Sequence, residues 1–197
     1  MSPNSLIVMA KGISIVNSLA LFLSQYTKTE QSSPYLIFLL NFSDTDIAAV
    51  DLYLKQNGAN KLPIHKIHSA ESSISNKRLD LYLKGGIFFV TYKILVLDLL
   101  SKKLSASIIT GLIVNNAHKA GGKGAKTGES FLAEIIRKGN PDAHIKAITD
   151  KSQALSRGSV ESLMKALHVN NLILYPRIKK SIKDSLDEVP GLEILEH

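Results

Sequence analysis

Residues 10–16, which read AKGISIV, stand where a phosphate-binding loop would lie, between an apolar run and a helical pattern. Such a loop reads G-x-x-x-x-G-K-S/T, and its lysine neutralises phosphate while its hydroxyl holds Mg²⁺. Gly12 remains here, but Ser14 replaces the second glycine, and Ile15 and Val16 replace the lysine and the hydroxyl residue. Ile15 and Val16 can neither counter phosphate charge nor ligate a metal. The segment therefore predicts a phosphate-binding loop that no longer binds a nucleotide.

A second degenerate segment follows the apolar run of residues 108–114 and reads Asn115-Asn116-Ala117-His118. Many helicases carry Asp-Glu-Ala-His at this point, where the Asp positions Mg²⁺ and the Glu polarises the attacking water. Amide side chains are neutral, so Asn115 and Asn116 cannot serve as anionic metal ligands or as a general base. His118 by itself would more often be a structural histidine. The segment therefore predicts no catalytic residue, no metal and no bound cofactor.

Four lysines are candidate contacts to a nucleic-acid backbone. Lys93 begins a predicted helix just after Thr91, and Lys119, Lys123 and Lys126 lie in a stretch rich in Gly and Lys at residues 119–128. A formal charge of +7 is compatible with binding a polyanion. For the loop lysines, a solvated loop without DNA contact remains an open alternative. The pair His65 and His68 lacks nearby carboxylates at ligand spacing, which disfavours a metal site there.

Apolar runs of strand length alternate with helical patterns along the chain, and together they must position these residues. Strands are predicted at residues 6–10, 35–42, 62–67, 87–91, 108–114, 144–149 and 171–175. Helices are predicted at residues 16–26, from Ser43 or Asp44 to 56 before Gly58, and at 92–100, 131–138, 159–167 and 178–186. Strands that are apolar along their whole length indicate an α/β fold with a mainly parallel sheet flanked by helices.

The composition narrows the class of protein further. The chain has 197 residues, of which 45% are hydrophobic, and it has no cysteine. These values suit one sizeable core and exclude a disulfide framework. No apolar run approaches the roughly 18 residues that span a bilayer, so we expect no membrane partner. Residues 195–197 (LEH) resemble the residues that precede a histidine tag in expression vectors, and we set them apart from the fold.

Several segments resemble the XPF family of DNA-repair endonucleases. They are GGIFFVT at residues 85–91, ILVLD at 94–98, ITGLIV at 109–114, AHK at 117–119 and IKAITD at 145–150. The resemblance is strongest over residues 85–177 and looser over residues 6–68. It implies that residues 1–155 form the first lobe of a RecA-like, P-loop-NTPase-type module that no longer hydrolyses ATP. Residues 156–194 would complete that lobe or begin the next subdomain.

The resemblance also implies a function. The module would be a non-catalytic platform for DNA junctions and forks and for repair scaffold proteins, in a nuclear endonuclease of nucleotide excision repair. The whole protein would pair with a smaller partner of nuclease fold through regions outside this chain. The family's Glu-Arg-Lys nuclease signature is absent from this sequence. An active superfamily-2 helicase or translocase lobe is the first alternative, and an unrelated basic α/β nucleic-acid-binding domain is the second.

Overall fold

The structure is a computed structural model that describes residues 4–27, 35–57, 63–67, 75–120, 127–155 and 157–187. Within these ranges, one sheet of seven strands has the order β3-β4-β2-β5-β6-β1-β7, and every neighbouring pair is parallel. The strands are β1 (Ser5–Met9), β2 (Leu36–Leu40), β3 (Ile64–Ile67), β4 (Gly86–Val90), β5 (Gly111–Val114), β6 (His144–Thr149) and β7 (Asn171–Tyr175).

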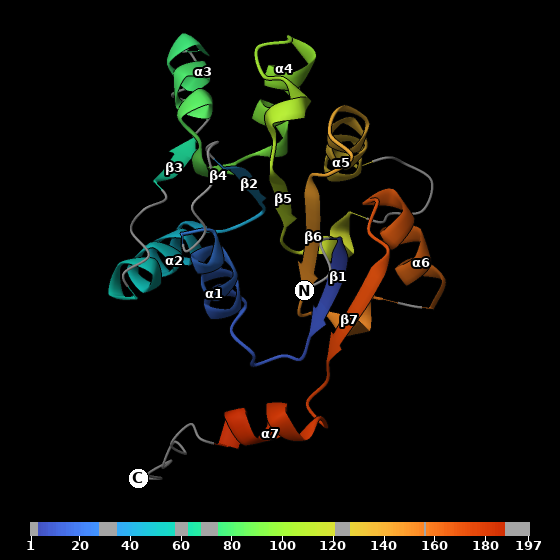
Figure 1. Cartoon of the computed structure of the whole chain (residues 1–197). Helices are drawn as coiled ribbons and strands as arrows, with labels where there is room; N and C mark the ends of the chain where they lie inside the picture. Colours follow the sequence, from blue (N-terminus) through green and yellow to red (C-terminus); the bar gives the residue numbers. More distant parts are fainter. Residues whose placement is uncertain are drawn as a thin grey trace, which may run out of the picture.

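Helices cover both faces of the sheet (Figure 1). They are α1 (Ile15–Thr27), α2 (Asp44–Gln56), α3 (Ser75–Lys84), α4 (Tyr92–Leu100), α5 (Gly128–Gly139) and α6 (Arg157–Ala166). Helix α7 (Lys180–Asp187) follows β7 and lies apart from the sheet (Figure 1). Helices α1 and α2 pack on one face through side chains such as Leu19 and Val50. Helices α3, α4, α5 and α6 pack on the other face, with Leu95 and Leu132 among their buried residues. The predicted parallel α/β fold is confirmed.

The apolar strands owe their composition to this double cover. All five residues of β2 and all five of β4 are buried, because each central strand has a helix layer above and below it. Alternate residues serve different cores: Phe38 belongs to the cluster under α3 to α6, whereas Ile37 and Leu39 belong to the cluster under α1 and α2. A strand exposed on one face would instead alternate apolar with polar residues.

Helix α2 starts where the sequence predicts it. Ser43 is its N-cap: the Ser43 Oγ accepts a hydrogen bond from the Asp46 N–H at 3.2 Å, and the Asp46 carboxylate accepts one from the Ser43 N–H at 2.9 Å. This reciprocal capping box satisfies amide groups that the first helical turn leaves free. The helix ends at the C-cap Asn57. Gly58, the predicted terminator, lies outside the described residues.

Three expectations about elements need correction. The strand predicted at residues 108–114 begins at Gly111, because residues 106–108 form a 3₁₀ turn that the Ser105 Oγ caps. Helix α3 is absent from the predicted elements, since its first residues are polar and its apolar pattern is short. The last helix begins at Lys180 rather than at residue 178. In the described part of the chain, no helix is long and apolar enough to cross a membrane.

Candidate functional site

The two degenerate motifs lie at the same edge of the sheet. Strand β6 pairs with both β1 and β5, and all three run parallel, so their carboxyl ends meet on one side. In these registers Val8 is opposite Thr149, and Val114 is opposite Ala147. The turn containing Gly12 follows β1, and Asn115 follows β5. This is the edge at which open α/β sheets bind their ligands.

The turn between β1 and α1 is short and is closed by its own residues. Gly12 has a φ of 104°, which L side chains rarely adopt. The Ser14 Oγ accepts a hydrogen bond from the Asn17 N–H at 3.1 Å, so it uses one of the amides that would otherwise face an anion. Ile15 and Val16 are packed against the core cluster under α1 and α2. The turn thus has apolar side chains where a phosphate-binding loop has its lysine and hydroxyl.

Asn115 and Asn116 are held by the end of the neighbouring strand β2. The Asn115 side chain is buried and donates to the Asn41 carbonyl at 3.3 Å, and the Asn116 amide donates to the same carbonyl at 3.4 Å. In return, the Asn41 amide donates to the Asn115 carbonyl at 3.3 Å and to the Glu129 Oε1 at 3.0 Å. These contacts tie β2, β5 and the first turn of α5 together. Glu129 is a carboxylate at this edge that no sequence motif indicates.

His118 connects the end of β5 to the end of β6. Its Nδ1 lies 2.9 Å from the Thr149 Oγ1, and Thr149 is fully buried. Burial lowers the pKa of His118, and the positive charges of Lys151 and Lys119 lower it further. The imidazole is therefore neutral at pH 7 and forms a structural hydrogen bond between two strand ends. This agrees with the interpretation of His118 as a structural histidine.

A cleft of about 660 Å³ opens at the carboxyl ends of β2, β3 and β4. Its walls come from Asn41, Lys66 and the residues 91–94 that begin α4. The Thr91 side chain makes no capping hydrogen bond, so the first amides of α4 have no side-chain acceptor from their N-cap. The Lys66 Nζ lies 2.6 Å from the carboxylate of Asp44, which also lines the cleft.

A buried ion pair fixes α4 beside this cleft. The guanidinium of Arg78 on α3 donates to both carboxylate oxygens of Asp98 on α4, at 2.8 and 3.2 Å, and the Tyr82 hydroxyl donates to the same carboxylate at 2.9 Å. The hydrogen bond to Asp98 raises the pKa of Arg78, and burial raises that of Tyr82. No sequence signal indicates this triad, because α3 itself has only a short apolar pattern.

Of the four candidate lysines, the structure describes two. Lys93 lies in the first turn of α4 and lines the cleft, and Lys119 is exposed in the 3₁₀ turn after β5. Lys123 and Lys126 lie outside the described residues. Of the histidine pair, His68 also lies outside them, and His65 stacks on Phe88 with ring centroids 4.7 Å apart. That stacking gives His65 a packing role.

Sequence comparison finds DNA-repair endonucleases among the relatives of this chain. The chain is 28% identical to DNA repair endonuclease XPF of Dictyostelium discoideum over 196 residues, or 96% of this chain. It is 32% identical to the XPF of Cricetulus griseus over 78% of this chain, and 29% identical to that of Drosophila melanogaster over 93%. The chain spans only 16–20% of the length of these curated relatives. No family model matches.

Structure comparison finds the same fold in a helicase domain. The crystal structure of the Pyrococcus furiosus Hef helicase domain matches with a TM-score of 0.73 and 15% sequence identity, covering 92% of this chain and 36% of that one. At this identity the likeness establishes the fold, and the seven-stranded parallel sheet with helices on both faces agrees with it. The chain is therefore similar in sequence to the XPF-type DNA-repair endonucleases over most of its length, and it has the RecA-like α/β fold of a helicase domain.

Proposed function

We propose that this chain is a non-catalytic helicase-like module of an XPF-type, structure-specific endonuclease. In this role it serves nucleotide excision repair as a platform that binds DNA junctions and docks repair proteins. The observation that carries the proposal is the edge at β1 and β5. There the Asn115 and Asn116 amides are hydrogen-bonded to the end of β2, and Ile15 and Val16 are packed against the core.

Two physical arguments support the loss of ATPase activity. The lysine position of a phosphate-binding loop is occupied here by Ile15, whose apolar side chain cannot offset the charge of the β- and γ-phosphates. The Asn115 and Asn116 amides are also engaged in hydrogen bonds with Asn41, and a neutral amide cannot act as a general base. An active helicase or translocase lobe would need both the phosphate-binding lysine and a general base, so this alternative is disfavoured.

Two of the proposed DNA contacts, Lys93 and Lys119, follow strands that end at this edge of the sheet. Lys93 and the uncapped start of α4 offer a positive side chain and helix N-terminal amide groups to a backbone phosphate. Lys119, Lys123 and Lys126 would extend this basic strip beyond β5. These contacts are to phosphate and are therefore independent of base sequence. DNA junctions and forks are the proposed ligands because the sequence relatives are DNA-repair endonucleases.

The whole protein would cut DNA, and this part of it would not. We propose that the nuclease centre and the contact to a smaller partner of nuclease fold lie in regions other than this chain, and that the protein works in the nucleus. Residues 1–155 would form the first lobe, with residues 156–194 completing it or leading to the next subdomain. Repair scaffold proteins would dock on surfaces of the lobe that DNA leaves free.

The decisive experiment is a calorimetric titration with Mg-ATP. The expected result is no measurable binding, since even a millimolar dissociation constant needs about 4 kcal/mol. Mg²⁺ alone serves as the control for heat from the metal. A micromolar affinity for Mg-ATP, or hydrolysis in a single turnover, would contradict the proposal and restore the helicase alternative.

A further inference from the structure

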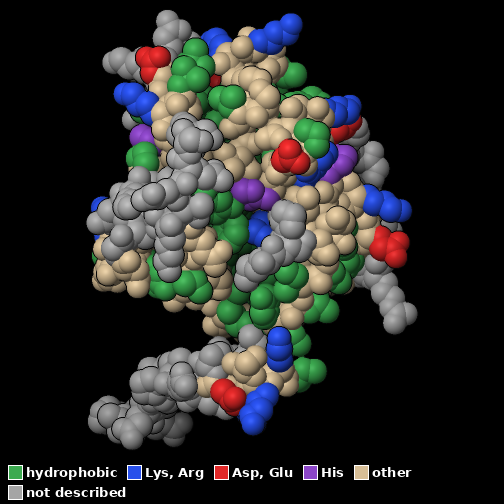
Figure 2. Space-filling model, viewed as in Figure 1, with side chains coloured by type: hydrophobic (Ala, Val, Ile, Leu, Met, Phe, Trp, Pro, Cys, Tyr) green, Lys and Arg blue, Asp and Glu red, His purple; other side chains and the backbone are tan. Residues whose placement is uncertain are grey.

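An apolar groove of about 260 Å³ lies on the face of the sheet that carries α1, away from the cleft described above. Its floor comes from β1, β5 and β6, one wall from α1 and the other from the end of β7. It is lined by Ile7, Met9, Ile13, Ser18, Leu19, Leu21, Phe22, Ile113, Lys146, Ile148 and Tyr175. In Figure 2, hydrophobic side chains gather on this face in the lower half of the view.

The groove is open because the helix layer ends before the sheet does. Helices α1 and α2 bury the side chains of the central strands on this face, such as Ile37 and Ile113. At the β7 edge of the sheet, Ile7 and Tyr175 are only half-buried, although both are apolar. Leu21 on the outer side of α1 is 57% exposed. Contiguous apolar surface of this kind is typical of a place where another chain binds.

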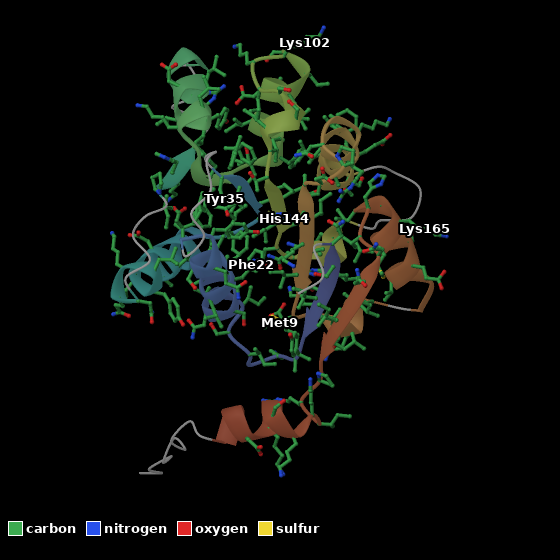
Figure 3. All side chains as sticks on the ribbon, in the orientation of Figure 1. Met9, Phe22, Tyr35, Lys102, His144 and Lys165 are labelled. Atoms are coloured by element: carbon green, nitrogen blue, oxygen red, sulfur yellow. The ribbon has the colours of Figure 1, made fainter. Side chains whose placement is uncertain are left out.

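Lys146 is the charged residue among those that line the groove. It is 4% exposed, and its ammonium lies 4.8 Å from the centre of the Phe22 ring. Beside it, His144 and Phe22 lie close together between β6 and α1 (Figure 3), with ring centroids 6.3 Å apart. Burial lowers the pKa of His144 to about 4, with Lys146 and Arg137 adding to the effect, so the imidazole is neutral at pH 7.

We propose that this groove docks a short segment of a partner protein in which an aliphatic or aromatic side chain stands beside a carboxylate. The apolar side chain fills the groove, and the carboxylate pairs with the Lys146 ammonium at its floor. A carboxylate suits the site because opposite charges attract more strongly where water is largely excluded. The formal charge of +7 on the whole chain also attracts acidic partners over a distance. This inference deepens the proposed function and rests on its protein-docking part.

Nucleic acid fits the groove less well. Bases bind to proteins by stacking on open aromatic faces. Here the Phe22 ring already contacts the Lys146 ammonium and packs edge-on against Tyr26, and the Lys179 ammonium lies 5.7 Å from the centre of the Tyr175 ring. The remaining lining residues are mostly aliphatic. These features favour an apolar peptide over single-stranded nucleic acid as the ligand of the groove.

A phage-displayed library of random heptapeptides, selected against the whole chain, tests the proposal. The expected enrichment is of sequences with Asp or Glu next to Leu, Met or Phe. Leu21→Glu, which places a carboxylate at the rim, should weaken the best peptide at least about tenfold, a cost of about 1.4 kcal/mol. Leu52→Glu is the matched control, because Leu52 is also 57% exposed but lies on α2 outside the groove.

Lys146→Met separates the charge from the apolar surface. This variant should still bind the selected peptide, but it should no longer distinguish the acidic form from a form with Gln or Asn in place of the carboxylate. An unchanged preference, or no enriched consensus, would overturn the proposal. So would a concentration-dependent dimer abolished by Leu21→Glu, which would assign the groove to a second copy of the chain. Fork-DNA binding measured on the same variants should be unchanged, and this separates the failure of the groove from that of the DNA-binding proposal.

Discussion

At the scale of single residues, the ion pair between Arg78 and Asp98 stands out because both side chains are almost completely buried. Their side chains are 11% and 4% exposed, and Tyr82 supplies a further hydrogen bond. A buried charge without its partner is costly, whereas the intact pair often contributes little more than an apolar pair of the same shape. We therefore interpret the triad as a device that sets the orientation of α3 against α4, and through α4 the position of Lys93.

Replacing one partner of this pair should reveal that cost. Asp98→Ala is expected to lower the free energy of unfolding by about 3–5 kcal/mol, because it leaves the Arg78 guanidinium buried without this counter-charge. The double variant Arg78→Met with Asp98→Leu should recover most of this stability. Urea unfolding followed by circular dichroism measures both. A decrease below about 1 kcal/mol for Asp98→Ala would show that the site is wetter than its burial indicates.

At the scale of elements, the sharpest boundary in the structure is the start of α2. It depends on two side chains, Ser43 and Asp46, which satisfy each other's backbone amides. The helix then carries Val50 and Leu54 into the core beneath β2 and β4. Since Asn41 directly follows β2, the same cap lies two residues from the hydrogen bonds that hold Asn115 and Asn116.

Removing the cap should weaken the fold modestly. Ser43→Ala is expected to destabilise the protein by about 1 kcal/mol, because the Asp46 amide loses its acceptor. Thr45→Ala is a suitable comparison: the Thr45 hydroxyl contacts the Ser43 Oγ at 2.8 Å, whereas the capping acceptor of the helix is Ser43 itself. Thermal unfolding of the two variants should show a lower melting temperature for Ser43→Ala. Equal melting temperatures would mean that water replaces the cap at no cost.

At the scale of the whole molecule, a chain with a formal charge of +7 should bind DNA through the phosphates. We expect weak binding without sequence preference, tighter for a fork than for plain duplex, that falls steeply as salt rises. A variant with Lys119, Lys123 and Lys126 changed to Ala should bind more weakly. Its slope of log affinity against log salt should be shallower by up to about 0.9 for each phosphate that is no longer neutralised.

Fluorescence anisotropy with forked, single-stranded and duplex DNA at low and physiological salt would measure these effects. Lys93→Ala, tested in parallel, reports on the contact at the start of α4. If the triple variant binds as well as the original chain, the loop does not bind DNA. If no DNA binds even at low salt, the DNA-binding part of the proposal is wrong and only the docking role is left.

The sequence by itself determined the fold class, and it predicts that the chain has lost the chemistry of ATP hydrolysis. Seven apolar runs alternating with helical patterns predict a buried parallel sheet, because strands covered on both faces are apolar throughout. The predicted loss rests on residue types alone, since Ile15, Val16, Asn115 and Asn116 lack the charges that ATP hydrolysis uses wherever they lie. The start of α2 was predicted from a local signal, Ser43 or Asp44 as the capping residue, and Ser43 is the N-cap.

Only the tertiary structure decided which residues meet across the chain. Asn41 and Asn115 come together because β2 and β5 are neighbours in the sheet, and Arg78 meets Asp98 because α3 packs beside α4. Neither pairing has a local sequence signal. The apolar groove likewise depends on where the helix layer ends relative to β7, which the spacing of hydrophobic residues does not encode. Local patterns specify elements, whereas contacts between elements arise from packing the whole core.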